Sequence, residues 1–218
     1  MHVDAYTGYK KLENFGITLV ECWAHTRRKF DEALKALTKS ERVSAKAGVG
    51  LECCNKLFAL EREYDKMELD HSKRCEARVL HSKPIAEAFF VWCEGMIAQT
   101  VPKSTFGMAV RYAANQRQWL MNFLLDGRLE LSNNRAENSI RPFTVGRKNW
   151  LFSYSPKGAK ASAVCYSIIE TAQANGLVPF LYLNYLFKVL PNISKDEFCE
   201  HLPWSLTVQK MCKIPQNQ

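Results

Sequence analysis

Residues 131–142 read Leu131-Ser132-Asn133-Asn134-Arg135-Ala136-Glu137-Asn138-Ser139-Ile140-Arg141-Pro142. The pair Asn133-Asn134 is typical of a helix start, because an asparagine side chain accepts hydrogen bonds from the unpaired N–H groups of a first helical turn. With Asn134 as the cap residue, Glu137 takes the third helical position. A glutamate there can complete a capping box and favours the positive end of the helix dipole. Capping is therefore one explanation of Glu137.

Glu137 is also the only acid in a strongly basic segment. From residue 135 to residue 160 the basic side chains are Arg135, Arg141, Arg147, Lys148, Lys157 and Lys160. A carboxylate in this setting suits a metal-dependent phosphodiester enzyme, because the cations can hold phosphates while the acid holds the metal ion. The alternative is an ordinary solvated helix face, on which an Arg141–Glu137 pair contributes only about 0.3 kcal/mol. The segment alone leaves both explanations open.

The composition indicates a globular protein with a polyanionic partner. The chain has 218 residues, 47% of them apolar, and its 30 Lys and Arg against 22 Asp and Glu give a net charge of +8. This length allows one sizeable core, or a core with a subdomain. The positive charge favours binding to nucleic acid. An anionic membrane surface would attract it too, but no long amphipathic basic helix is expected in the basic segment.

Neither a membrane protein nor a secreted one is expected. No apolar run approaches the roughly 20 residues of a membrane-spanning helix, and the N-terminal sequence Met1-His2-Val3-Asp4 has no signal-peptide character. The eight cysteines are scattered, mostly at apolar positions of helical patterns. This spacing indicates reduced thiols in a cytoplasmic protein rather than a disulfide framework.

The first half of the chain is expected to form two short strands and then helices. Residues 3–4 end a first strand, and the β-branched run 16–22 indicates a second. Apolar residues at helical spacing over residues 40–125 predict a helical hairpin or a small bundle, with Pro84 in the first turn of a helix.

The second half is expected to be helical with one further strand. Residues 150–152 fit a short strand and residues 155–158 a turn. A helix should end at Gly176, and Pro179 should open another. Ser194 with Glu197 has the spacing of a capping box.

Five ordered motifs together resemble the catalytic half of insertion sequence 66-type transposases. They are Val3-Asp4-Ala5-Tyr6-Thr7-Gly8-Tyr9, Cys22-Trp23-Ala24-His25-Thr26-Arg27-Arg28-Lys29-Phe30, Asn133-Asn134-Arg135-Ala136-Glu137 with Ile140-Arg141-Pro142, Gly146-Arg147-Lys148-Asn149-Trp150, and Tyr166-Ser167-Ile168-Ile169-Glu170-Thr171-Ala172 with Asn175-Gly176. The tail Leu202-Pro203-Trp204 is also similar to the C-terminal end of that family. The resemblance covers nearly the whole chain, and five motifs in order are more specific than any one of them.

The resemblance implies a DDE-type transposase, in which two aspartates and a glutamate on a ribonuclease H-like core bind two Mg²⁺ ions. Asp4 matches the second aspartate and Glu137 the glutamate. Hard divalent cations prefer carboxylate oxygens, and a metal pair can hold the attacking and leaving oxygens of an in-line phosphoryl transfer. The implied reaction is hydrolysis at the ends of a mobile element, followed by attack of the freed 3′-hydroxyl on target DNA. The alternative for Asp4 is a turn aspartate at a strand end.

The fold class expected from the resemblance is α+β, mostly α: a truncated ribonuclease H-like core with a helical insertion and a C-terminal helical tail. Residues 1–40 would hold the second-aspartate strand and the CxxH helix, and residues 41–125 the insertion. Residues 126–176 would hold the core helix with Glu137 and the basic segment, and residues 177–218 the tail. Asp4 and Glu137 would then meet at one cation site.

Other motif residues have both a functional and a structural explanation. Cys22 and His25 form a CxxH that lacks the further ligands of a zinc site, so burial beside the active site explains them as well. The basic run Arg27, Arg28 and Lys29 either contacts phosphates or forms an exposed helix face. Trp23 and Trp150 can stack on bases, but core packing explains both. Asn133 and Asn134 are cap residues first, with any DNA contact secondary.

The chain also departs from the family pattern. The first aspartate of the family has no match, Asn138 replaces an arginine, and Val178 replaces an acidic helix cap. We therefore expect a truncated copy that is inactive alone and exposes a strand edge that a separately encoded N-terminal part completes. The expected partner is DNA, with a homo-oligomer in the complete enzyme and a nucleoid-associated, cytoplasmic location. The alternatives are a catalytically inactive DNA-binding remnant and a helical interaction protein without a DNA role.

Overall fold

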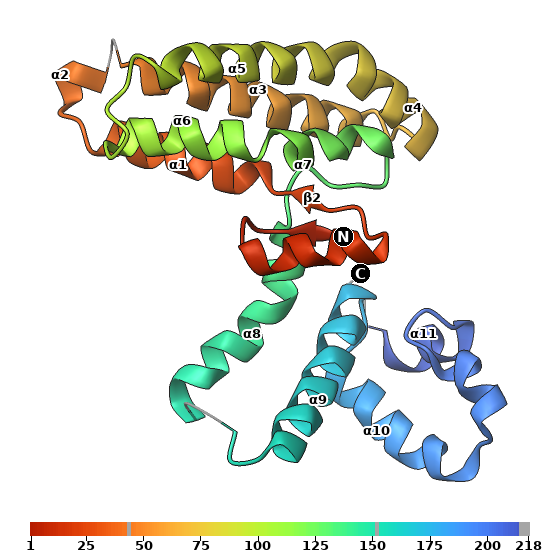
Figure 1. Cartoon of the computed structure of the whole chain (residues 1–218). Coiled ribbons are helices and arrows are strands. Elements are labelled where there is room, and N and C mark those ends of the chain that lie inside the picture. The colour runs from red at the N-terminus through yellow and green to blue at the C-terminus, as the bar shows by residue number, and fades with distance from the viewer. Residues whose placement is uncertain (43–44, 151–152, 214–218) are drawn as a thin grey trace. The chain divides into compact units, whose positions relative to one another are not determined.

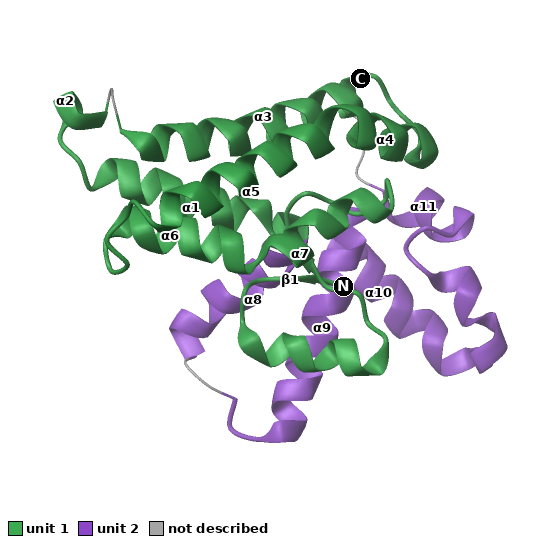
Figure 2. Cartoon of the chain, turned by 45° about the horizontal axis from the view of Figure 1, so that its top comes forward, with its two compact units in different colours: residues 1–135 green, residues 136–218 purple. Residues whose placement is uncertain are grey.

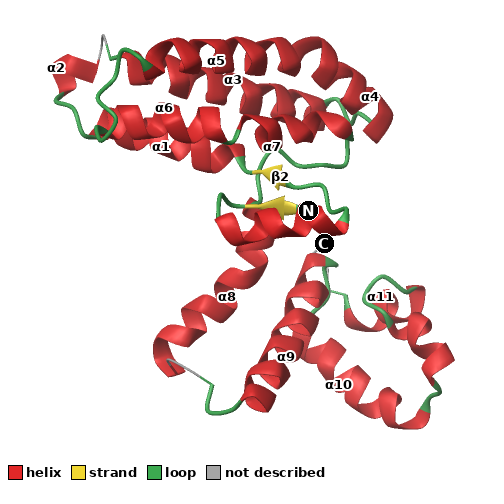
Figure 3. Cartoon of the chain, in the orientation of Figure 1, coloured by secondary structure: helices red, strands yellow, loops and turns green. Residues whose placement is uncertain are grey.

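The chain forms two compact units. The computed structural model describes residues 1–42, 45–150 and 153–213. Unit 1 is Met1–Arg135 and unit 2 is Ala136–Gln218 (Figure 2). The predicted segments 1–40 and 41–125 both lie in unit 1, and segment 126–176 spans the boundary, so the four-part division stays a prediction. The described residues are mostly helical with two short strands (Figure 3), which confirms a mostly α, α+β composition. A ribonuclease H-like core stays a prediction.

The two strands of unit 1 run parallel. Strand β1 (His2–Val3) pairs with β2 (Val20–Glu21) in the register His2↔Val20 and Val3↔Glu21. A 3-10 helix, η1 (Thr7–Phe15), connects them and ends at Gly16, whose φ of +73° favours glycine. Because η1 and Gly16 occupy the first part of the connection, the strand predicted over residues 16–22 is only two residues long. In the described part of the chain, each strand pairs only with the other.

The helices of unit 1 form a bundle. They are α1 (Trp23–Lys35), α2 (Lys39–Arg42), α3 (Lys46–Lys66), α4 (His71–Ala77), the π-helix η2 (Arg78–Ser82), α5 (Lys83–Ile97), α6 (Thr105–Asn115), α7 (Arg117–Met121) and the 3-10 helix η3 (Asn122–Leu125). Helix α1 packs on α3 and α6, and α5 packs on the same two helices (Figure 1). The predicted bundle over residues 40–125 is thus confirmed, with α1 as an additional member. Pro84 lies in the first turn of α5, as predicted, although helical backbone runs unbroken from α4 through η2 into α5.

Aromatic side chains fill the core of unit 1. The ring of Trp23 lies 5.5 Å from that of Phe89 and 5.7 Å from that of Phe90, and Phe30 lies 5.7 Å from Phe89. Trp23 is fully buried, and its indole N–H donates to the carbonyl of Leu120 at 2.8 Å. Core packing is therefore the role of Trp23, as predicted.

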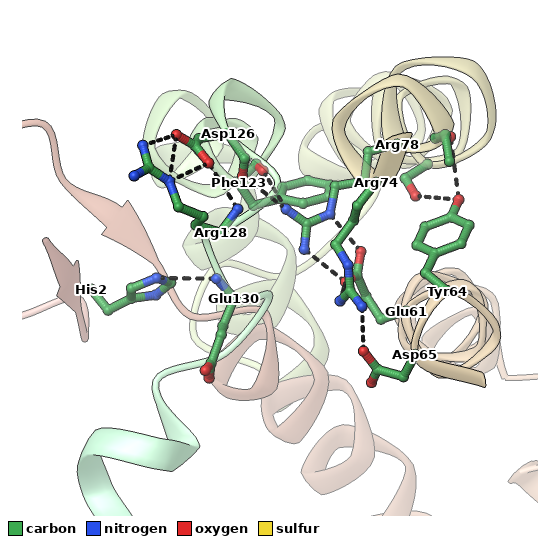
Figure 4. A network of polar contacts seen from close by, with 12 residues as sticks. His2, Glu61, Tyr64, Asp65, Arg74, Arg78, Phe123, Asp126, Arg128 and Glu130 are labelled. Atoms are coloured by element: carbon green, nitrogen blue, oxygen red, sulfur yellow. Dashed lines mark hydrogen bonds and ion pairs between the residues drawn. The ribbon is translucent and has the colours of Figure 1, made fainter. Parts of the chain in front are cut away.

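A buried ion pair ties the helices to the segment that leads to residues 131–142. Arg78 is fully buried and donates to both carboxylate oxygens of Glu61, each at 2.7 Å (Figure 4). Its Nη1 also donates to the carbonyls of Phe123 and Asp126, at 3.0 and 3.1 Å. Arg74 adds a contact to Glu61 at 3.3 Å. One guanidinium thus joins α3, η2 and the end of η3.

Unit 2 consists of helices. They are α8 (Asn134–Trp150), whose first two residues belong to unit 1, α9 (Pro156–Ala174), α10 (Pro179–Val189), the 3-10 helices η4 (Leu190–Asn192) and η5 (Lys195–His201), and α11 (Leu206–Cys212). A small core that includes Ala172, Leu177, Tyr182 and Val208 joins α9, α10 and α11.

Several predicted boundaries in unit 2 are confirmed. Gly176 follows α9 with a φ of +70°, and Pro179 is the first residue of α10. Ser194 and Glu197 form the predicted capping box. Val178 precedes α10 without a side-chain cap bond, as expected from the loss of an acidic cap.

Two other predictions for unit 2 need correction. Residues 155–158 begin α9 instead of forming a turn, because the Ser155 hydroxyl accepts from the Gly158 N–H at 3.1 Å and Pro156 suits a first helical position. Trp150 is the last residue of α8, and residues 151–152 of the predicted strand lie outside the described residues. No described helix is long and apolar enough to cross a bilayer.

Candidate functional site

Asp4 lies at the edge of the sheet where both parallel strands end. It directly follows β1, and Cys22 directly follows β2. The Asp4 carbonyl accepts from the Tyr6 N–H at 2.7 Å, and its Oδ1 lies 3.4 Å from the same nitrogen. Asp4 thus takes part in a turn, which is the alternative role predicted for it. Because the Asp4 side chain is exposed, its carboxylate is also accessible to a ligand.

Glu21 is a second carboxyl group beside Asp4, and the sequence analysis missed it. It ends β2, is only 2% exposed, and its Oε1 accepts from the Tyr112 hydroxyl at 3.2 Å. The pKa of Glu21 is raised to about 7, mainly by burial and also by the negative charge of Asp4, against the opposing effects of the Tyr112 hydrogen bond and Lys10. The available signal was an acid at the end of an otherwise apolar strand.

The cation expected at this edge would need hard oxygen ligands. Asp4 and Glu21 supply two carboxylates, the ligand type that Mg²⁺ prefers. They fit this cation by their chemistry. In residues 1–42, 45–150 and 153–213, no three or more His, Cys, Asp or Glu side chains form a group that could hold a metal ion.

Glu137 lies in the first turn of α8, in unit 2. The sequence analysis predicted Asn134 as the cap residue that precedes the helix. In the structure Asn134 is the first residue of α8, and Asn133 is the residue that precedes it. The Asn134 N–H lies 3.5 Å from the hydroxyl oxygen of Ser132. Asp4 belongs to the other unit, so its convergence with Glu137 stays a prediction.

The CxxH motif and the Asn133-Asn134 motif meet at the start of α1. Cys22 is fully buried, and its sulfur accepts from the Asn133 N–H at 3.4 Å. One residue along, the Trp23 N–H donates to the Leu131 carbonyl at 3.0 Å. The expected burial of Cys22 at a strand end is confirmed, and its contact with Asn133 is structural. His25 lies half-buried in the first turn of α1, and all eight cysteines are free thiols.

The basic run on α1 divides among different roles. Arg27 donates from Nε to the side-chain oxygen of Asn55 at 2.6 Å, which holds it against α3. The Lys29 ammonium lies 4.6 Å from the centre of the Tyr112 ring. Arg28 is exposed and lines an open groove of about 790 Å³ together with Arg27 and Arg62. Of the three, Arg28 is the most accessible for a phosphate.

The basic segment around Glu137 is exposed. Arg135 contacts Glu130 at 3.3 Å with most of its side chain in solvent. The basic residues of this segment that lie in unit 2 are also exposed: Arg141, Arg147 and Lys148 on α8, and Lys157 and Lys160 on α9. Trp150 is 36% exposed and its ring lies 5.2 Å from Phe143, so the expected core burial of Trp150 is wrong.

Two family models identify the family of the chain. The sequence model of the Transposase IS66 family matches residues 1–161, and that of the IS66 C-terminal element matches residues 167–204. The chain is 32% identical over 217 residues to the uncharacterized protein y4qI of Sinorhizobium fredii, which is 94% of the chain and 38% of that protein. It is 29% identical over 214 residues to y4hP of the same bacterium, covering 92% of the chain and 38% of that protein. The chain thus spans about two-fifths of the length of these relatives, and no solved structure matches it significantly.

Proposed function

Because this chain belongs to the transposase IS66 family, we propose that it is the C-terminal catalytic portion of a DDE-type transposase. In this role it takes part in DNA cleavage and strand transfer during the transposition of a mobile element. The observation that carries the proposal is the family match over residues 1–161, which includes both Asp4 and Glu137. DNA is the proposed partner.

In this proposal, Asp4 and Glu137 hold the catalytic cations. The position of Asp4 at the carboxyl edge of a parallel strand pair supports it, since side chains there are accessible and close to a neighbouring strand end. When bound, Mg²⁺ ions would stabilise negative charge on the attacking and leaving oxygens of the phosphodiester. The exposed cations Arg28, Lys148 and Lys157 would hold and orient phosphates.

Two of the three carboxylates that the family resemblance implies have matches in these 218 residues. We therefore propose that this chain binds DNA but does not cleave it alone, and that another segment or chain supplies the first aspartate. The complete enzyme would be a homo-oligomer. Strand transfer by the purified chain would contradict this part of the proposal.

The competing function is an inactive DNA-binding protein that uses the same basic residues, and metal dependence separates the two. The affinity of the purified chain for a short duplex is measured by fluorescence anisotropy with Ca²⁺ and with a chelator. We expect Ca²⁺ to tighten binding, since the cation would bridge carboxylates and phosphate, and we expect Glu137→Gln to remove this effect.

A matched control keeps the test specific. Glu170→Gln removes the same charge from α9 in the same unit and should preserve the Ca²⁺ effect. If the wild-type affinity is independent of Ca²⁺ and Glu137→Gln binds more tightly at every condition, the basic residues alone account for binding. That outcome would overturn the catalytic assignment.

A further inference from the structure

We propose that an open groove along α1 and α3 in unit 1 binds the phosphates of DNA through Arg27, Arg28 and Arg62. The proposal rests on the proposed function in taking DNA as the partner. It adds Arg62, which belongs to none of the five sequence motifs. It also places a DNA contact on the helical bundle, in addition to the basic segment around Glu137.

Two packed helices supply the basic side chains of this groove. Its volume is about 790 Å³, and its basic residues are Arg27, Arg28 and Lys35 on α1 and Arg62 on α3. Helix α1 packs on α3, and the Arg27 Nε donates to the side-chain oxygen of Asn55 at 2.6 Å across this contact. The bond orients the Arg27 guanidinium, whose two Nη groups make no hydrogen bond within the described residues. An oriented guanidinium can donate two bonds to one phosphate.

Arg28 and Arg62 have no internal partner. Both are exposed, and in the part of the chain that the structure describes neither makes a hydrogen bond, an ion pair or a ring contact. Their side chains are long and flexible, so they can adjust to a phosphate without a prearranged geometry. Both guanidinium groups are therefore available to an anion in the groove.

The acids of the groove do not cancel this charge. Asp31 is already paired with Lys35, at 2.7 Å on the same helix. Glu32 also lines the groove, is exposed, and makes no ion pair with any described residue. Three arginines thus share the groove with one carboxylate that has no cation partner, which leaves the groove positive.

A neighbouring groove of about 540 Å³ provides an internal comparison. Arg62 and Phe58 line both grooves. The other arginines of the second groove have acid partners, several of which Figure 4 shows: Arg74 with Glu61 and Asp65, Arg78 with Glu61, Arg128 with Asp126, and Arg135 with Glu130. A phosphate there would have to displace a carboxylate. In the first groove it meets arginines without acid partners, so the first groove is the better phosphate site.

The first groove also includes a residue of the Glu137 motif. Asn134 lines it, is exposed and still belongs to unit 1. Its side-chain amide adds a neutral donor, and such donors commonly contact backbone phosphates. A DNA strand in the groove would therefore contact the first residue of the helix that carries Glu137.

Fluorescence anisotropy of the full chain with one short duplex, over a range of salt concentrations, tests the site. Arg28→Gln and Arg62→Gln should each weaken binding and reduce the slope of log affinity against log salt by about 0.9, and the double variant by about 1.8, because each lost phosphate contact releases fewer counterions. Arg128→Gln, an exposed arginine of the neighbouring groove with an acid partner, is the matched control and should leave the slope unchanged.

A second pair of variants removes negative charge. Glu32→Gln takes the uncompensated acid out of the groove and should tighten DNA binding. Glu63→Gln removes an exposed acid from α3 that lines neither groove, and it should give a smaller gain. Equal gains would mean that the overall charge of the chain attracts DNA, which would overturn the site. Circular dichroism of each variant checks folding.

A footprint on the wild type tests the site without any substitution. Lys35 lines the groove, whereas Lys66 is an exposed lysine of α3 that lines neither groove. Bound duplex should protect Lys35 from acetylation, measured by mass spectrometry, and should leave Lys66 reactive. Equal reactivity of Lys35 with and without bound duplex would overturn the site.

The remaining outcomes separate this inference from the proposed function. Unchanged slopes in Arg28→Gln and Arg62→Gln, or an equal loss in Arg128→Gln, would overturn the groove site. If the Ca²⁺ effect on DNA affinity is nevertheless present, the proposed function stands without this site. If the slopes fall as expected but Ca²⁺ has no effect, the site stands and the catalytic assignment fails. A wild type that does not bind DNA would overturn both.

Discussion

Glu21 places an ionisable carboxyl group where water reaches only 2% of the residue. Motif matching gave no reason to select it, because its one sequence signal, an acid at the end of an otherwise apolar strand, belongs to none of the motifs. Asp4 was selected through a family motif, Glu137 through its basic surroundings and a family motif, and Cys22 through its spacing to His25. The orphaned oxygen of Gln116 depends on neighbours far away in sequence. At the residue scale, motifs locate side chains, whereas burial and hydrogen-bond satisfaction require the packed structure.

The raised pKa of Glu21 makes stability depend on pH. Below its ordinary value of 4.5 the group is neutral in both folded and unfolded chains, and above about 7 the folded chain must bury the charge. Its contribution to the free energy of unfolding is therefore lost as pH rises from 4.5 to about 7. Glu21→Gln should be more stable than the wild type at pH 8 by about 1–3 kcal/mol.

Urea denaturation in the presence of a chelator measures this difference. The advantage of Glu21→Gln over the wild type should shrink on moving from pH 8 to about pH 4.5. Asp31→Asn, a change at a half-buried acid on α1, provides the reference profile. Parallel pH profiles for Glu21→Gln and wild type would show that Glu21 keeps an ordinary pKa in the folded chain.

Two glycines of α3 should respond oppositely to the same substitution. A Cβ at Gly50 would lie 2.5 Å from the ring of Phe30, whereas a Cβ at Gly48 would meet nothing within 4 Å. Alanine favours a helix by about 1 kcal/mol over glycine. Gly48→Ala should therefore stabilise the chain, while Gly50→Ala should destabilise it by about 1–3 kcal/mol through overpacking. Thermal unfolding of both variants checks this, and a stabilising Gly50→Ala would mean that Phe30 can move.

The sequence predicted element boundaries correctly where local chemistry sets them. Gly176, Pro179 and the Ser194 capping box were predicted because each acts on its own turn of backbone. The π-helix η2 was not predicted, since it has no comparable local signal and lies where Arg78 is drawn into the core. The membership of α1 in the bundle likewise depends on contacts with α3 and α6 that no local pattern contains.

The ion pair between Arg78 and Glu61 should be essential for joining α3, η2 and the end of η3. Glu61→Gln leaves a fully buried guanidinium with one neutral partner in place of a carboxylate, and removal of one member of a buried pair typically costs about 3–5 kcal/mol. Glu63→Gln, an exposed acid on the same helix, is the matched control. Urea denaturation measures both, and equal effects would show that the pair is not energetically important.

At the scale of the whole molecule, the sequence predicted a mostly helical chain with a few short strands and a family, but not the geometry of an active site. The family was accessible because five motifs occur in order, independently of their distances in space. The predicted meeting of Asp4 and Glu137 depends on distance in space. They lie in different units, and no sequence pattern in either unit fixes their separation. The contribution of each unit to DNA binding is therefore tested by removing positive charge from one unit at a time.

The position of positive charge, rather than its total, should decide DNA affinity. Lys148, Lys157 and Lys160 are exposed in unit 2, and Lys39, Lys66 and Lys103 are exposed in unit 1. Replacing either set by alanine removes the same charge, but only the first set lies in the basic segment around Glu137. If these three lysines contact phosphates, their loss should reduce the slope of log affinity against log salt by up to about 2.7, at about 0.9 per phosphate contact. The second set should leave the slope unchanged, because a residue that releases no counterion from DNA does not enter it. Fluorescence anisotropy with one duplex over a range of salt concentrations measures both slopes, and an equal loss from the two sets would mean that the overall charge of the chain, and not the segment around Glu137, attracts DNA.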